Sequence, residues 1–200
     1  MRRFVIMGNR AISSGKLKLN DLASAGGRMD VIVRAIMSSL LLSHGIRKDC
    51  EVIIHLLGGP GPSRRIKFVG SEITGLHAEE RSVAGQIAKI IREPLPPIGV
   101  WKKCSDGIYD SGGSIENTLA ELTDSRIIIL DADGENLVSE QKNSPSCDDI
   151  TFVVSDDKPL EISNPENHIR RSLGNTWLQG HIAIGICHYL LDEKFSLNLN

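Results

Sequence analysis

Three segments of small and polar residues have the composition to bind the edge of a flat ligand. They are residues 130–134, 154–157 and 173–178, and each follows the end of an expected strand or helix. Small residues let backbone N–H and C=O groups approach a ring closely and hydrogen-bond its edge. Ligands of parallel α/β sheets bind beyond the carboxyl ends of the strands, where such segments converge. Ordinary turns explain the same composition equally well.

Common ligand-binding motifs are absent from the chain. No G-x-G-x-x-G follows a strand, no phosphate-binding loop with its lysine is present, and nothing reads G-x-S-x-G. The run from Asp131 to Gly134 resembles a calcium loop, but its glycine stands two positions too early. An α/β protein without these motifs must bind its ligand in a less common way.

No metal site or disulfide framework is predicted. The four cysteines are spread along the chain without C-x-x-C spacing, which is typical of free thiols: Cys50, Cys104, Cys147 and Cys187. His181 and His188 would share one helix face, but no third ligand accompanies them.

The formal net charge of −2 gives the molecule no overall attraction to phosphate, so nucleic-acid binding would need a local basic face. The alternative is that the basic clusters are solvated surface. The chain lacks an apolar stretch long enough for a membrane span and a signal-peptide pattern, and we expect a cytoplasmic protein. The candidate basic residues are Arg2, Arg3, Arg10, Lys16 and Lys18; Arg64, Arg65 and Lys67; and Arg170 and Arg171.

Strands alternate with helices along the chain, which favours a largely parallel sheet covered by helices on both faces. The strongest helix covers residues 29–41, where apolar residues follow helical spacing, and Gly45 is placed to end it. A further helix is expected to start at Asn164, and the last helix to place Ile182, Ile186, Tyr189 and Leu190 on one apolar face. Strands are expected at residues 3–7, 52–57, 66–69, 126–130 and 151–154, and helices also at 79–91 and 114–122.

Several blocks resemble the archaeal tRNA pseudouridine N1-methyltransferases, in family order and with near-family spacing. They are residues 27–32 (GRMDVI), 42–47 (LSHGIR), 66–72 (IKFVGSE), 80–81 (ER), 172–174 (SLG) and 188–192 (HYLLD). That family belongs to the SPOUT methyltransferases. The resemblance implies a single SPOUT domain over residues 1–200, with an N-terminal part at 1–100 and a knotted, cofactor-binding part at 124–195. The C-terminal trefoil knot is implied by the resemblance alone, because knots are too rare to be expected otherwise.

The resemblance also implies S-adenosylmethionine (SAM) as cofactor, a homodimer, and a structured RNA, above all tRNA, as substrate. The first and last helices are candidate dimer surfaces, although apolar helix faces also form ordinary core. The positions that correspond to the SAM-binding residues of the family are Leu130, Ser155, Leu173, Gly174, Leu178 and Ala183.

Arg28 and Asp30 match the Gly-Arg-x-Asp block of the family and are the candidate catalytic residues. A carboxylate could accept the N1 proton of pseudouridine, and an arginine could stabilise charge on the neighbouring carbonyl. The alternative is an ion pair at the start of the first helix, where an acidic residue is favourable in any case. Glu80 and Arg81 allow the same two interpretations, a functional pair or a structural salt bridge, and the salt bridge is slightly favoured.

Some positions depart from the family pattern. Ala183 replaces a cysteine, Ser155 replaces a glycine, and residues 110–113 (DSGG) replace expected arginines, a loss that should weaken phosphate binding. The sequence therefore leaves three hypotheses open. They are a SAM-dependent tRNA pseudouridine N1-methyltransferase, a methyltransferase with the same chemistry on ribosomal RNA, and a SAM-binding protein without transferase activity.

Overall fold

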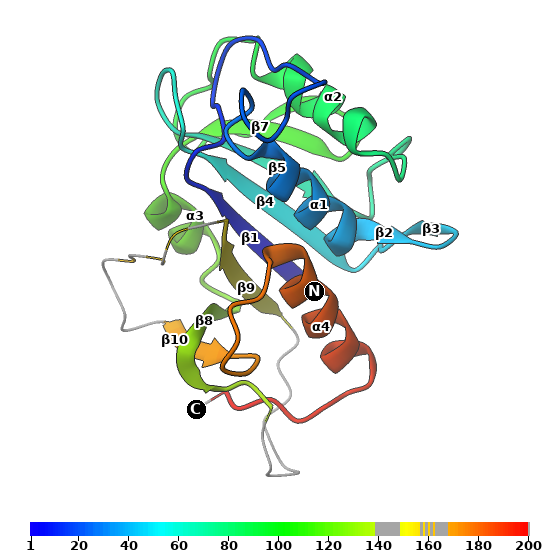
Figure 1. The fold of residues 1–200 in the computed structure, drawn as a ribbon, viewed down its shortest axis with the longest axis vertical. Helices are drawn as coiled ribbons and strands as arrows, with labels where there is room; N and C mark the ends of the chain where they lie inside the picture. The colour runs from blue at the N-terminus through cyan, green and yellow to red at the C-terminus, as the bar shows by residue number, and fades with distance from the viewer. Residues whose placement is uncertain (139–148, 157, 159, 161, 163–167, 200) are drawn as a thin grey trace.

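The structure, a computed structural model, describes residues 1–138, 149–156, 158, 160, 162 and 168–199. One eight-stranded sheet runs through these residues in the order β10-β8-β9-β1-β4-β5-β7-β6 (Figure 1). Its strands are β1 (Arg2–Gly8), β4 (Cys50–Leu56), β5 (Arg64–Val69), β6 (Lys102–Ser105), β7 (Ile108–Gly112), β8 (Arg126–Asn136), β9 (Ile150–Ser155) and β10 (His168–Ser172). The helices are α1 (Met29–Leu40), α2 (Glu80–Ile90), α3 (Ile115–Glu121) and α4 (Gly180–Asp192).

The sheet is parallel from β10 to β4 and antiparallel from β4 to β6. Central β1 pairs in parallel with β9 on one side and with β4 on the other. The carboxyl ends of β8, β9, β1 and β4 therefore lie at one edge of the sheet, which we call the carboxyl edge. Binding segments that follow these strands are brought to the same side of the molecule.

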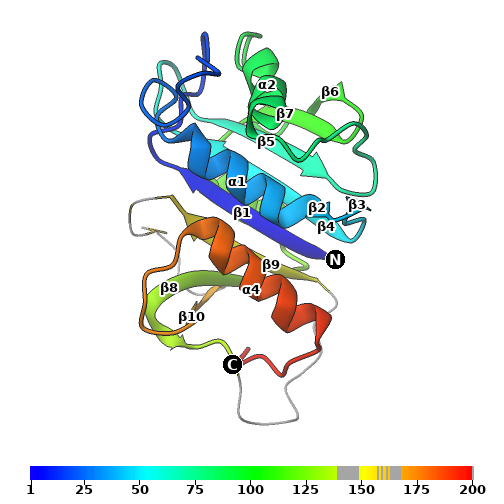
Figure 2. The same cartoon turned by 45° about the vertical axis from the view of Figure 1, so that its right-hand side comes forward.

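Helices cover both faces of the sheet, as the sequence predicted. Alternate side chains of β1 separate the two layers: Phe4 and Ile6 pack in the core with α1, α2 and α4, whereas Val5 and Met7 pack with α3. In Figures 1 and 2, α1 and α4 lie side by side on one face, and α3 lies behind the sheet.

The strongest predicted helix is present, but it ends earlier than predicted. α1 stops at Leu40 because Leu41 takes an extended conformation. The two-residue strand β2 (Leu41–Leu42) then pairs with β3 (Gly45–Ile46), so Gly45 lies in a hairpin and does not cap the helix. The helical spacing of apolar residues continues through Leu41, so nothing in the sequence indicates that the helix ends at Leu40.

Two predictions in the second half were wrong. The predicted turn at residues 131–134 lies inside β8, where the pairing with β10 shifts from Ile129 opposite Arg170 to Glu135 opposite Arg171. Residues 130–134 therefore bulge out of the ladder. The helix predicted to begin at Asn164, a start that lies outside the described residues, does not continue, because residues 168–172 form β10.

The four residues predicted to share one face of the last helix differ in exposure, because Leu190 is buried. α4 buries Ala183, Ile184 and Cys187, whereas Ile182 and Tyr189 are about half exposed. The helix is apolar on nearly every side, so its spacing alone could not identify the face that packs on α1. The connections from β8 to β9 and from β9 to β10 include residues outside those described, and the trefoil knot stays a prediction.

Candidate functional site

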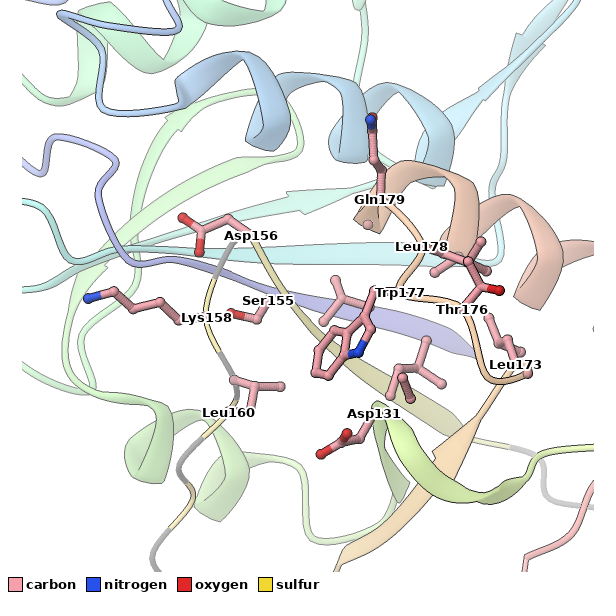
Figure 3. A pocket seen from close by; sticks show the side chains of 16 residues that line it. Asp131, Ser155, Asp156, Lys158, Leu160, Leu173, Thr176, Trp177, Leu178 and Gln179 are labelled. Carbon is pink, nitrogen blue, oxygen red and sulfur yellow. The ribbon is translucent and has the colours of Figure 1, made fainter.

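A cavity of about 340 Å³ lies at the carboxyl edge of the sheet, beyond β8 and β9 and beside the start of α4. This volume falls within the range of small-molecule pockets. Figure 3 shows the indole of Trp177 among side chains that come from three separate segments of the chain. The cavity is lined by Leu130, Asp131, Ala132, Val154, Ser155, Asp156, Lys158, Leu160, Leu173, Gly174, Thr176, Trp177, Leu178, Gln179, Gly180 and Ala183.

All residues predicted to bind the cofactor line this one cavity. They are Leu130, Ser155, Leu173, Gly174, Leu178 and Ala183. The three segments singled out by their small, polar composition thus converge at the expected edge of the sheet. Sequence reasoning missed the pocket roles of Trp177 and Leu160. Trp177 carried a usable signal, because it is one of two tryptophans in the chain and stands within one of the three segments.

The segment before α4 offers unsatisfied backbone donors to the cavity. Among the residues that the structure describes, the N–H groups of residues 175–178 form no backbone hydrogen bond. Gly174 has a φ of 123°, a conformation that other residues rarely adopt. The first turn of α4 begins at Gly180 in the cavity wall, and its N–H groups carry partial positive charge. This wall can therefore hydrogen-bond acceptor atoms and stabilise a carboxylate.

Neighbouring residues hold two acidic side chains of the cavity in place. Asp131 accepts a 2.6 Å bond from Arg170, which also donates to the carbonyl of Leu160 and so ties two parts of the wall together. Asp156 accepts bonds from the backbone and side-chain nitrogens of Asn9, at 2.8 and 2.6 Å. The side chain of Asn9 also donates to the hydroxyl of Ser155. The end of β1 is thereby fixed to the end of β9 in the cavity wall.

The candidate catalytic pair does not line the cavity. Arg28 precedes α1 with a φ of 64°, and its Nε lies 3.2 Å from the carboxylate of Asp30. The same carboxylate lies 3.6 Å from Arg34, which in turn bonds Glu80 at 2.8 Å. A left-handed conformation is uncommon for an arginine and is a form of strain that is frequent at functional sites. The ion pair of the alternative interpretation is present, and the catalytic role stays a prediction.

Glu80 pairs with a residue other than the one expected. Its carboxylate bonds Arg34 across the interface between α2 and α1, so the predicted salt bridge to Arg81 was wrong. Arg28, Asp30, Arg34 and Glu80 therefore form one chain of charges that connects the start of α1 with the start of α2.

Most of the basic residues considered for RNA binding are engaged within the protein. Arg64 and Arg65 are almost completely buried, so the prediction that they contribute to a basic face was wrong. Arg2 and Arg3 lie at the amino end of β1 and form ion pairs with acidic residues: Asp49 and Asp192 for Arg2, and Glu51 and Asp149 for Arg3. Arg171 is buried, and Arg170 bonds Asp131.

The residues that replace the expected arginines lie in the interior. Asp110 and Ser111 are buried in β7, where they face Arg64 and Arg65 of β5. Burial raises the pKa of Asp110 to about 6, and the nearby positive charge of Arg64 opposes this rise. This departure from the family pattern therefore affects internal pairing and not an exposed phosphate-binding surface.

Within the described part of the chain, no group of three metal-ligating side chains is found, and no helix is long and apolar enough to cross a bilayer. The three described cysteines, Cys50, Cys104 and Cys187, are free thiols, as predicted, while Cys147 lies outside the described residues.

Comparisons with known proteins agree with the geometry. The family described as "Putative SAM-dependent RNA methyltransferase" matches residues 1–194. The tRNA (pseudouridine(54)-N(1))-methyltransferase of Methanocella arvoryzae is 38% identical over 160 residues, which cover 80% of each chain. The Methanococcoides burtonii enzyme of the same name is 34% identical over 204 residues, which cover 100% of this chain and 98% of the relative.

A solved structure shares the fold. Archaeoglobus fulgidus Nep1 bound to S-adenosylhomocysteine aligns with a TM-score of 0.59, 14% sequence identity, and coverage of 96% of this chain and 98% of that chain. Such low identity supports similarity of fold alone. The match over residues 1–194 and the identity to the two archaeal relatives go further, and they show that the chain belongs to the SAM-dependent RNA methyltransferase family that includes the archaeal tRNA (pseudouridine(54)-N(1))-methyltransferases.

Proposed function

We propose that this protein transfers the methyl group of SAM to N1 of pseudouridine in tRNA. The observation that carries the proposal is the convergence of Leu130, Ser155, Leu173, Gly174, Leu178 and Ala183 on one cavity. In this proposal residues 124–195 form the cofactor-binding part, and residues 1–100 supply the candidate catalytic pair. The names of the archaeal relatives support tRNA as the substrate.

The cavity has the chemistry that SAM requires. Leu130, Leu160 and Leu173 offer apolar surface to the adenine ring, and Trp177 offers an aromatic face. The backbone donors of residues 175–178 can bond the ring edge or the ribose, and the start of α4 can stabilise the carboxylate of the methionine moiety. When bound, SAM supplies an electrophilic methyl group on a sulfonium.

The protein contributes positioning and proton transfer. Displacement at a methyl carbon requires the nucleophile in line with the leaving group, so holding the two reactants in contact supplies much of the rate enhancement. In this proposal the carboxylate of Asp30 accepts the N1 proton of pseudouridine. The guanidinium of Arg28, 3.2 Å from that carboxylate, stabilises charge on the adjacent carbonyl.

The test is incubation of the purified protein with labelled SAM and two tRNA transcripts that differ only in one pseudouridine or uridine. Label in the pseudouridine transcript alone, with N1-methylpseudouridine identified by mass spectrometry of the nucleosides, is the expected result. Label in ribosomal RNA alone would support the second hypothesis, a methyltransferase with the same chemistry on ribosomal RNA. Tight SAM binding measured by calorimetry without transfer to any RNA would favour a binding protein.

We further propose a cytoplasmic homodimer that associates through the outer face of α4. Ile182 and Tyr189 are about half exposed on this helix, and the ring of Tyr189 contacts Phe195, which is also exposed. Exposed apolar side chains gathered on one helix are typical of an interface. Tyr189→Glu should convert a dimer into a monomer in light-scattering measurements, and a wild-type protein that is already monomeric would contradict the proposal.

A further inference from the structure

The segment that joins β1 to α1, residues 9–28, combines several cations with exposure to solvent. We call it the β1–α1 loop. It contains four basic residues, Arg10, Lys16, Lys18 and Arg28, and one acidic residue, Asp21. The Asp21 carboxylate accepts bonds from backbone nitrogens within the same loop. Arg10, Lys16 and Lys18 are exposed. The loop is therefore a local positive surface on a protein whose net charge is −2.

The two ends of this loop touch the two candidate functional regions. Asn9, its first residue, donates hydrogen bonds to Ser155 and Asp156 in the cavity wall. Arg28, its last residue, forms the ion pair with Asp30. In Figure 2 the dark-blue loop lies at the carboxyl end of β1, on the side of the molecule where the chain also enters α4. The loop therefore connects the wall of the cavity with the candidate catalytic pair along the chain.

The loop is held in one conformation by bonds to two neighbouring segments. Ser13 donates from its backbone and side chain to the carbonyls of Gly59 and Pro60, at 2.9 and 3.2 Å. Gly15 donates to the carbonyl of Ile91 at the end of α2. A rigid loop loses little conformational entropy when a ligand binds, which favours affinity.

Close backbone packing adds to this rigidity. The carbonyl oxygen of Arg10 lies between Gly27 and Gly58, where an added Cβ atom would stand 1.8 and 1.9 Å from it. No side chain fits at either position, so the backbone that carries Arg10 is fixed on two sides. The direction in which the loop presents its cations is thereby set by the fold.

We propose that the β1–α1 loop binds the phosphate backbone of the structured RNA substrate, through Lys16 and Lys18. This inference rests on the proposed function and assigns its RNA-binding surface. The other candidate cations have partners within the described residues: Arg2, Arg3, Arg64, Arg65, Arg170 and Arg171 are buried or form ion pairs, and the amine of Lys67 lies over the rings of Trp101 and Tyr109. The two lysines belong to the same segment that contacts the cavity wall through Asn9 and Asp30 through Arg28.

The experiment compares two double variants of the full-length protein. Lys16→Gln with Lys18→Gln removes two cations from the loop. Lys48→Gln with Arg126→Gln removes two exposed cations from the opposite edge of the sheet, where Lys48 precedes β4 and Arg126 begins β8. Affinity for a pseudouridine-containing tRNA transcript is measured by fluorescence anisotropy over a range of KCl concentrations without SAM, and SAM affinity is measured by calorimetry.

The loop variant should bind RNA more weakly, and the slope of log affinity against log salt should fall by about 1 for each lysine removed. The control variant should retain the wild-type slope, and both should retain wild-type SAM affinity. A loop variant with the wild-type slope, or a control variant that loses as much slope, would overturn the inference. If the wild-type protein methylates RNA while the loop variant binds it normally, only this inference fails. If the loop lysines set the salt slope but no methyl group is transferred, only the proposed function fails.

Discussion

Replacement of His188 should change how stability depends on pH. His188 is buried between α4 and α1, where its Nε2 lies 2.9 Å from the carbonyl of Ser39 and its Nδ1 lies 3.1 Å from a nitrogen of Arg2. Because a carbonyl only accepts and a guanidinium only donates, the ring must be neutral with its proton on Nε2. The pKa of His188 is lowered from 6.5 to about 4, chiefly by burial and also by the charges of Arg47 and Arg2, while the bond to Ser39 and the Asp192 carboxylate oppose the change.

The direction in which stability changes with pH follows from the number of protons bound by the folded and unfolded states. Between pH 6.5 and 4 the unfolded chain protonates this histidine and the folded protein does not, so stability falls as the pH decreases through this window. Each pH unit corresponds to ~1.4 kcal/mol, and the 1.5 units from 6.5 to 5 therefore give a loss of about 2 kcal/mol. Other groups contribute as well. His55, whose pKa is lowered to about 3 by burial, adds a loss of the same sign, and Asp110, with its raised pKa, contributes the opposite sign below pH 6.

The assay therefore compares the pH dependence of stability in two proteins. Urea denaturation of the wild type and of His188→Gln is followed at pH 7 and pH 5, and glutamine retains one donor and one acceptor without titrating. We expect the variant to lose about 2 kcal/mol less than the wild type between these two pH values. An equal loss in both proteins would refute the assignment of a neutral, buried His188.

Three further predictions concern the site and its scaffold. Asp30→Asn should lower the rate of methyl transfer about 100-fold or more while SAM affinity is retained, and equal losses of activity and folding stability would identify Asp30 as structural. Gly174→Ala should weaken SAM binding measured by calorimetry by about tenfold, because no atom would clash with the new Cβ and the cost comes from the φ of 123° alone. Arg65→Ala should destabilise the protein by about 3 kcal/mol in urea denaturation, since it removes buried bonds to Gly112, Thr118 and Ser111, and a change below 1 kcal/mol would contradict this account.

The elements with a local signal were predictable from the sequence. The apolar spacing of α1, the buried strands β1, β4 and β9, and the capping serine of α3 all follow from residues close together in the chain. The three segments that line the cavity were also identified, because small residues after a strand are a local pattern and the parallel topology brings them to one edge. The prediction that particular residues within these segments bind SAM depended on the family resemblance.

The missed features depend on contacts between distant residues. Arg64 and Arg65 have the composition of a surface cluster, yet β5 lies inside the sheet and the two side chains find partners on α2, α3 and β7. Likewise, nothing near Asp131 indicates a bulged strand, because the shift arises from pairing with β10, about 40 residues later. The charge of a residue and its tendency to form turns indicate where it is found most often. Its contacts with residues distant in sequence determine whether it lies at the surface or in the interior of this fold.

The position of Asn9 suggests how cofactor binding and RNA recognition can vary separately within one fold. β1 pairs on one side with β9, which ends in the cavity wall, and on the other side with β4. At its end, Asn9, the first residue of the β1–α1 loop, fixes Ser155 and Asp156. The cavity is built from backbone groups and buried strands, which tolerate few changes, whereas Lys16 and Lys18 are exposed side chains on a fixed backbone. Substitutions in this loop can therefore change the strength of RNA binding without disturbing the methyl-donor cavity.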